Sequence, residues 1–176
     1  LKRALPRTVP IPAGVSILHW DGRAWSARPA PELSAAYAMS GSAADDVWVV
    51  GTSASGAPAL HWDGSTWTAV AVPTTRMVRD VWVWSRDEAW AVGDDAAYRW
   101  DGATWRTARS APDPGYFVSV WGFGPDDVWV VELLDGALHW DGASWTLAWS
   151  GTLEDLSGVW GAAPDDVWAV GDSDTI

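Results

Sequence analysis

Three observations predict an all-β protein, a β-propeller of four-stranded antiparallel blades. A Trp-rich motif recurs four times, at spacings of 42, 38 and 40 residues. Each repeat divides into four short strand-like segments bounded by Gly, Pro and Asp turn residues. No segment combines a helical period with helix caps. A four-stranded sheet repeated at this period is typical of propeller blades, which bury their faces against neighbouring blades.

The first motif, (His/Arg)-Trp-Asp-Gly-x-x-Trp, predicts the third and fourth strands of each blade. Its Asp-Gly step is the strongest short-range signal for a tight hairpin between two strands. The motif occupies residues 19–25, 61–67, 99–105 and 139–145. Its central structural residues are Trp20, Asp21, Gly22, Trp62, Asp63, Gly64, Trp100, Asp101, Gly102, Trp140, Asp141 and Gly142.

The second motif, Asp-(Asp/Glu)-x-Trp-x-Val, predicts the second strand of each blade. Its Trp residues are Trp48, Trp90, Trp129 and Trp168. A turn precedes it, and in two copies this turn is Pro-Asp-Asp, in which Pro presets the dihedral and Asp can bond its own downstream backbone. The first strand ends eight residues before this Trp, at Trp82, Trp121 and Trp160, or at Ser40 in the first copy.

Tryptophan is the outlier of the composition, with 17 residues in 176. Fifteen of the 17 stand at repeat positions, and only Trp84 and Trp149 do not. A single four-stranded sheet is too small to bury both of its faces alone. We therefore expect the repeat-positioned Trp side chains to form the core between blades rather than a binding surface.

The phase of the repeat predicts three whole blades and two complementary half-blades after an N-terminal extension of residues 1–14. The predicted boundaries are a half-blade at 15–29, blades at 33–71, 76–109 and 115–150, and a half-blade at 156–176. The favoured arrangement is a latch, in which the two half-blades join and close a four-bladed ring. The alternatives are a piece of a larger propeller or a homo-oligomer in which a second copy supplies the missing half.

Charge and composition limit the classes of partner that the chain is expected to bind. The formal net charge is -12, which disfavours nucleic acid and anionic membranes, because both require clustered Lys and Arg. No apolar run is long enough to span a membrane. The absence of cysteine excludes disulfides and Cys-ligated metals. One Lys accompanies ten Arg, a bias that suggests a GC-rich bacterial genome.

On the Trp-Asp-Gly-x-x-Trp and Val-Trp-Ala-Val motifs, residues 15–171 resemble bacterial β-propeller repeats of the Asp-box (BNR) and tectonin-like kinds. The Asp-box proper has one more residue between Asp and Gly, whereas Asp63 and Gly64 are adjacent here. The resemblance implies the propeller fold and a set of functions that includes glycosidases, lectins and adhesion or assembly factors. An extracellular or cell-surface location is the corresponding expectation.

A sialidase-like glycosidase is the sharpest enzyme hypothesis, and the sequence disfavours it. Such an enzyme needs an Arg cluster with a Tyr and an acid. Tyr37, Tyr98 and Tyr116 have no obvious paired context, and the Asp residues recur at turns in every repeat. A catalytic acid should break the repeat rather than follow it. We expect no catalytic residue and no cofactor.

Metal binding is the second chemical hypothesis. His19, His61 and His139 recur once per repeat, and Arg99 stands at the fourth position. Metal ligands must converge within a few ångströms, whereas symmetric positions in separate blades do not. We expect each His to pack at a blade interface with a ring nitrogen bonded to backbone. Turn-capping is likewise preferred over calcium binding for the Asp-Asp turns and for Asp172 and Asp174, so no metal is expected.

Residues that depart from the repeat are the best candidates for binding, because blade geometry does not explain them. The candidate binding residues are Trp84, Arg99, Glu132, Trp149, Tyr98 and Arg79, with Arg76, Tyr116 and Phe117 as further candidates nearby. They predict a non-enzymatic binding or scaffold propeller whose ligand is a carbohydrate or a protein. A structural or assembly module of a larger bacterial surface protein is the alternative, and a glycosidase is the second alternative.

Overall fold

The structure is a computed structural model that describes residues 16–30, 32–56, 58–111, 116–133, 136–150 and 155–172. Within these ranges all regular structure is β-strand, which confirms the predicted all-β class. The same ranges contain no helix with the length and apolarity to cross a membrane.

Three complete blades and two half-blades follow one another along the chain, as predicted. The first blade comprises β3 (Ala35–Ala43), β4 (Asp46–Thr52), β5 (Ala59–Trp62) and β6 (Trp67–Val70). The second comprises β7 (Val78–Ser85), β8 (Glu88–Gly93), β9 (Ala96–Trp100) and β10 (Trp105–Ser110). The third comprises β11 (Phe117–Gly124), β12 (Asp127–Glu132), β13 (Gly136–Trp140) and β14 (Trp145–Trp149). The N-terminal half-blade is β1 (Ser16–Trp20) and β2 (Trp25–Pro29), and the C-terminal half-blade is β15 (Asp155–Ala163) and β16 (Asp166–Asp172).

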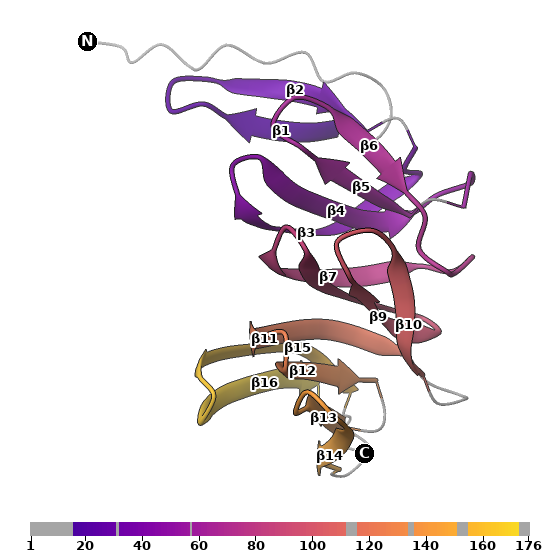
Figure 1. The fold of residues 1–176 in the computed structure, drawn as a ribbon, viewed down its shortest axis with the longest axis vertical. Coiled ribbons are helices and arrows are strands. Elements are labelled where there is room, and N and C mark those ends of the chain that lie inside the picture. Colours follow the sequence, from indigo (N-terminus) through magenta and orange to yellow (C-terminus); the bar gives the residue numbers. More distant parts are fainter. Residues whose placement is uncertain are drawn as a thin grey trace.

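The blades form an open arc (Figure 1). The first strands β3, β7, β11 and β15 contact one another in that order, so they line one side of the arc. The two half-blades are separate two-stranded sheets at opposite ends of it. The latch expected from the sequence is therefore wrong for this structure. The blade-to-blade steps turn the chain through only part of a circle, and the complementary halves do not meet.

The Asp-Gly hairpins form as predicted in all four repeats. The turn residues Gly22, Gly64, Gly102 and Gly142 have φ between 86° and 95°, a left-handed conformation that Gly adopts without a Cβ penalty. The Trp residues that flank each turn face each other in register, as in the Trp62–Trp67 pair. We call these two residues, the last of the third strand and the first of the fourth, the Trp pair of a blade.

Tryptophan packing joins successive blades. Trp48 of the first blade contacts the Trp pair of the second, with ring centroids 4.9 Å from Trp100 and 5.2 Å from Trp105. Trp90 of the second blade contacts the Trp pair of the third in the same way, at 6.0 and 5.6 Å. Trp48 and Trp90 are 0% and 1% exposed, as a core position requires.

The expectation that every repeat-positioned Trp is buried is wrong at the ends of the arc. Trp168 occupies the same repeat position as Trp90 and is 64% exposed, and Trp20, Trp25 and Trp160 are also exposed. The cause is geometric, because a blade face becomes core only when another blade covers it.

Polar contacts between first strands accompany the Trp packing. The Asp80 carboxylate on β7 accepts hydrogen bonds from Ser119 Oγ at 2.8 Å and Val120 N at 3.0 Å on β11. Burial raises the pKa of Asp80, although these hydrogen bonds oppose the shift. Gly122 lies against the Trp82 ring so closely that a Cβ there would be 2.6 Å from a ring carbon.

Candidate functional site

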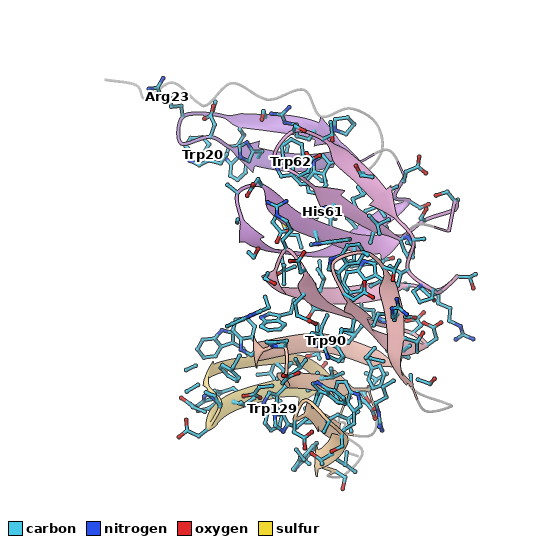
Figure 2. The ribbon with its side chains drawn as sticks, in the orientation of Figure 1. Trp20, Arg23, His61, Trp62, Trp90 and Trp129 are labelled. Atoms are coloured by element: carbon cyan, nitrogen blue, oxygen red, sulfur yellow. The ribbon has the colours of Figure 1, made fainter. Side chains whose placement is uncertain are left out.

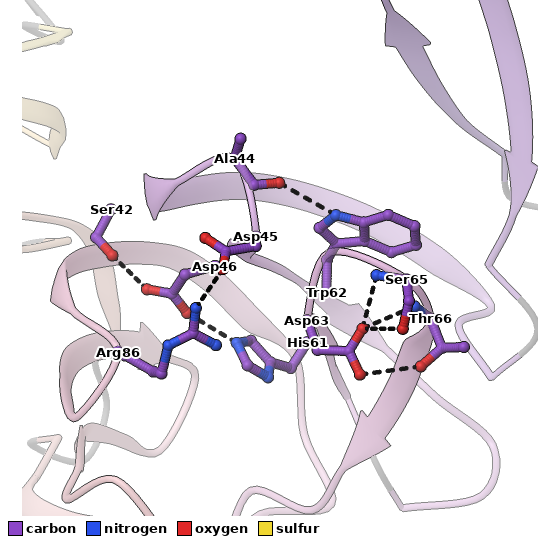
Figure 3. A network of polar contacts seen from close by, with 10 residues as sticks. All are labelled: Ser42, Ala44, Asp45, Asp46, His61, Trp62, Asp63, Ser65, Thr66 and Arg86. Carbon is purple, nitrogen blue, oxygen red and sulfur yellow. Dashed lines mark hydrogen bonds and ion pairs between the residues drawn. The ribbon is translucent and has the colours of Figure 1, made fainter.

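The repeated His and Asp side chains build a structural network inside the first and third blades; Figure 2 labels His61 of the first blade, and Figure 3 shows its network from close by. His61 Nε2 lies 2.8 Å from Asp46 Oδ1, and Asp46 also accepts a hydrogen bond from Ser42 Oγ. The His61 ring stacks on Trp48 with centroids 4.5 Å apart. The expected hydrogen bond from His to a backbone group is therefore wrong for His61, because Asp46, the first residue of the second strand, places its carboxylate within hydrogen-bond distance of the ring.

The third blade repeats this Asp–His–Trp unit. His139 Nε2 lies 2.7 Å from Asp127 Oδ1, and its ring stacks on Trp129 with centroids 4.4 Å apart. His61 and His139 are thus each engaged by the neighbouring strand of their own blade, whereas His19 is exposed in the two-stranded N-terminal half-blade. Within the part of the chain that the structure describes, no group of three or more His, Asp or Glu residues is placed to hold a metal ion. Asp174, considered above for calcium, lies outside the described residues.

The second blade contains a variant of the same unit. Arg99 replaces His and donates from Nε and from a terminal nitrogen to Glu88, at 2.6 and 2.9 Å. Its guanidinium lies 5.5 Å from the centroid of the Trp90 ring. The hydrogen bond to Glu88 raises the pKa of Arg99. The departure at Arg99 is therefore matched by a longer acid on the facing strand, and both residues lie in the structural network.

The Asp residues of the hairpins are turn acceptors. Asp63 Oδ1 accepts hydrogen bonds from the backbone N–H groups of Ser65 and Thr66, both at 2.8 Å (Figure 3). These bonds stabilise the charged carboxylate and lower its pKa. The pKa of Asp101 is lowered to about 2 by its bond from the Thr104 backbone and its contact with Arg106. A carboxyl group held in its charged form is not suited to act as a general acid.

The contacts at the corner where the second and third blades meet, at the start of their first strands, differ from these repeated ones. Arg79 Nε donates to Asp94 Oδ1 at 2.7 Å, and the guanidinium carbon lies 4.1 Å from the centroid of the Tyr116 ring. The positions equivalent to Arg79, three residues before the first-strand Trp, are Val118 and Ser157 in the following repeats. We call this set, Arg79 with Asp94 and Tyr116, the Arg79 corner.

A second layer of hydrogen bonds supports the loops of this corner. The Tyr98 hydroxyl donates to Asp95, and Thr74 Oγ1 donates to the same carboxylate at 2.8 Å. Burial, followed by the bond to Asp95, raises the pKa of Tyr98. The side chain of Tyr98 is 0% exposed. It therefore supports the loops of the corner from the core and offers no surface to a ligand.

The other sequence candidates lie elsewhere. Trp84 is half exposed on β7, beside Trp82 at a centroid distance of 6.0 Å. Trp149 is exposed at the end of β14 and lines a cavity against the C-terminal half-blade. Of the six candidates, only Arg79 belongs to the Arg79 corner, and Tyr98 lies behind it in the core between the first and second blades. Whether any of the six binds a ligand stays a prediction.

Glu132 interrupts a glycine position that recurs in the other repeats. At its position the other repeats have Gly51, Gly93 and Gly171, where a Cβ would lie 1.9 to 2.3 Å from the carbonyl oxygen of a residue at the start of the first strand or directly before it. The Glu132 side chain is buried, and in its blade a tight position lies at Gly136, where a Cβ would be 2.0 Å from the Trp149 carbonyl oxygen on the fourth strand.

Asp94 is the member of the corner that sequence reasoning missed. In the sequence it is one more Asp in a turn, and the acidic turns recur throughout the chain. The available signal was its position, because an Asp-Asp pair directly after the second strand occurs only in this blade.

The stacked four-stranded blades place this chain in the β-propeller class of folds. No known protein-family model matches the sequence, and no curated protein matches it. Among solved structures, it is similar to "YCF48 bound to D1 peptide", with a TM-score of 0.65, 15% identity, and coverage of 85% of this chain and 52% of that one.

A second similar structure is YCF48 from Cyanidioschyzon merolae, with a TM-score of 0.58, 12% identity, and coverage of 80% of this chain and 49% of that one. The chain thus spans about half the length of both propellers. At these identities the likeness concerns the fold. The propeller part of the sequence resemblance is confirmed, and the Asp-box and tectonin-like assignments stay predictions.

Proposed function

We propose that this chain is a non-enzymatic propeller that binds a protein ligand, and that the Arg79 corner contacts it. The observation that carries the proposal is the Arg79 guanidinium, held over Tyr116 by its ion pair with Asp94. Arg and Tyr are enriched among the residues that dominate protein–protein binding energy. The likeness to a propeller whose structure includes a peptide supports a protein ligand over the other classes.

The chemistry of the corner indicates the kind of ligand. Asp94 occupies Nε of Arg79, which leaves the other guanidinium N–H groups to donate to carbonyl or carboxylate oxygens. Tyr116 offers a partly exposed aromatic face beside them, and the exposed Arg76 adds a second cation three residues before Arg79. These groups suit an extended protein segment in which an apolar side chain neighbours a carboxylate.

Carbohydrate is the alternative ligand, and the exposed aromatic faces of Trp84 and Trp149 support it. A role as a structural module of a larger bacterial surface protein also stays a proposal. For the glycosidase we propose no residue, because the described Asp side chains of the hairpins are turn acceptors.

The test is selection of a random peptide library displayed on phage against the wild-type chain, followed by fluorescence anisotropy of the selected peptides. Arg79→Ala and Tyr116→Ala are each expected to weaken binding by about 10-fold or more, as for an interface hot spot. Arg86→Ala is the matched control, because Arg86 also pairs with an Asp, at 2.8 Å, but lies in the turn between β7 and β8.

Equal peptide affinities for the wild type and Arg79→Ala would remove the corner from the interface. Binding on a glycan array, together with no peptide enriched from the library, would favour the carbohydrate ligand instead.

A further inference from the structure

Asp80 is a departure from the repeat that lies directly beside the Arg79 corner. Its position, ten residues before the second-strand Trp, holds Ala38, Ser119 and Gly158 in the other repeats. Only the second blade therefore places a carboxyl group at this point of its first strand. The side chain is partly buried, and it reaches from β7 to β11, across the step between the second and third blades.

The Asp80 carboxylate is surrounded by hydrogen-bond donors. Its Oδ1 accepts from the Val81 backbone N–H at 2.9 Å, and its Oδ2 accepts from Ser119 Oγ at 2.8 Å and from Val120 N at 3.0 Å. The Ser119 oxygen itself accepts from Val159 N at 3.4 Å, so the hydroxyl proton is directed to Asp80. Three donors thus converge on two oxygens, an arrangement that suits a charged carboxylate.

A neutral Asp80 side chain cannot keep all three of these bonds. A protonated carboxyl group carries an O–H that must itself donate, whereas both of its oxygens face donors here. It is also a weaker acceptor than a carboxylate. The Val81 N–H belongs to the next residue of the same strand and stays in place. The bonds from β11 are therefore the ones that a small movement between the blades would release.

The bonds of Asp80 join the same two segments as the Arg79 corner. Arg79 is the residue before Asp80, and Tyr116 precedes Ser119 by three residues and Val120 by four. The Arg79 guanidinium carbon lies 4.1 Å from the centroid of the Tyr116 ring, across the same step between blades. A shift of β11 along or away from β7 would therefore move Tyr116 relative to Arg79.

We propose that the Asp80 carboxylate is a positioning group for the Arg79 corner, and that neutralising it releases Tyr116 from Arg79. Because the corner is the proposed ligand site, this regulation rests on the proposed function. The movement of Tyr116, in contrast, can be measured without a ligand.

The surroundings of Asp80 make it the group that controls this step. The strands packed against β7 are β3, β4, β8 and β11. The titratable or charged side chains on β7 and on these strands are Arg79, Tyr37, Asp46 and Glu88. Arg79 pairs with Asp94, and Asp46 and Glu88 each pair within their own blade. Burial raises the pKa of Asp80 above its ordinary value of 3.8, and the bonds from Val120, Ser119 and Val81 oppose this rise.

The direction of this pKa change makes the release local. Because the folded chain raises the pKa of Asp80, it binds the proton more readily than the unfolded chain does. With respect to this group, acidification through that range favours the folded state. Protonation should therefore rearrange the step between the blades without unfolding the chain.

The test follows Tyr116 by NMR in a chain labelled with carbon-13 in its tyrosine rings. The sequence contains three Tyr, so Tyr37 serves as the internal reference, and Tyr116→Phe assigns the Tyr116 signals. Asp80→Asn keeps the shape of the side chain and removes its charge, so its Tyr116 signals should leave the wild-type positions at neutral pH. The wild-type signals should move towards those of Asp80→Asn as the pH falls from about 7.5 towards the pI of about 4.3, whereas Asp80→Asn should show no such movement.

Ser40→Ala is the matched control. Ser40 Oγ accepts from Val83 N at 3.2 Å between the first strands of the first and second blades, so the variant loses a bond of the same kind away from the corner. It should leave the Tyr116 signals in place. Ser119→Ala removes a donor to Asp80 and should move Tyr116 in the same direction as Asp80→Asn, with less than additive movement in the double variant. Far-UV circular dichroism of each variant must match the wild type.

Peptide binding then connects the positioning role to the ligand site. Asp80→Asn should weaken the binding of library-selected peptides by about 10-fold at neutral pH, and Ser40→Ala should not weaken it. Unmoved Tyr116 signals in Asp80→Asn overturn the positioning role. Movement with pH that persists in Asp80→Asn overturns the assignment of the switch to Asp80. Tyr116 signals that move as expected, with unchanged peptide affinity, support the positioning role and overturn the proposed ligand site instead.

Discussion

Replacing Trp90 by Ala tests whether the stacked Trp packing holds neighbouring blades together. Trp90 is 1% exposed and contacts both members of the Trp pair of the third blade, at 6.0 and 5.6 Å. Burial of roughly 200 Å² of aromatic surface at about 25 cal/mol/Å² gives about 5 kcal/mol. Substitutions of this kind in protein cores cost about 3–5 kcal/mol. We therefore expect Trp90→Ala to lower the free energy of unfolding by about 3–5 kcal/mol.

Trp84→Ala is the matched control, because it removes the same side chain from the same blade at a half-exposed position. Its expected cost is about 1–2 kcal/mol, in proportion to the smaller buried area. The assay is urea unfolding followed by far-UV circular dichroism, since the fluorescence of the chain changes when a Trp is removed. Slopes of the transitions must agree between variants for the comparison to report stability. Equal losses for the two variants, within about 0.5 kcal/mol, would refute burial at the blade interface as the source of stability.

Two further predictions concern the polar groups of the blades. Glu88→Gln should lower the free energy of unfolding by about 1 kcal/mol, because Arg99 is partly exposed and loses a charge-assisted pair at 2.6 Å. The double variant Glu88→Asp with Arg99→His, which installs the pair of the other blades, should recover most of this loss in the same urea assay, and no recovery would argue against equivalence of the two units. For Asp101 the folded-state pKa is lowered to about 2 from 3.8, so its stabilisation is present above about pH 4 and is lost as the pH falls towards 2. Asp101→Asn keeps a turn acceptor without the titration and should flatten the acid side of a plot of melting temperature against pH; an unchanged acid side would contradict the assignment.

Local signals in the sequence were sufficient for the blades themselves. The Asp-Gly steps predict four hairpins, and Gly22, Gly64, Gly102 and Gly142 adopt the left-handed conformation that these turns need. The spacing of the Trp residues predicts three whole blades and two halves. Both results depend on contacts within about ten residues, where turn chemistry and strand alternation act directly.

The repeat pattern did not predict the contacts between blades. Trp90 and Trp168 share one repeat position, yet one is buried and the other exposed, because a neighbouring blade covers only the first. The pairing of Arg99 with Glu88 and the contact of Arg79 with Tyr116 join residues from different strands or blades. The sequence by itself thus determined the blade, its turns and its number of copies. The tertiary structure alone decided the open arc, the exposed ends and the Arg79 corner, because the angle between stacked sheets sets which side chains meet.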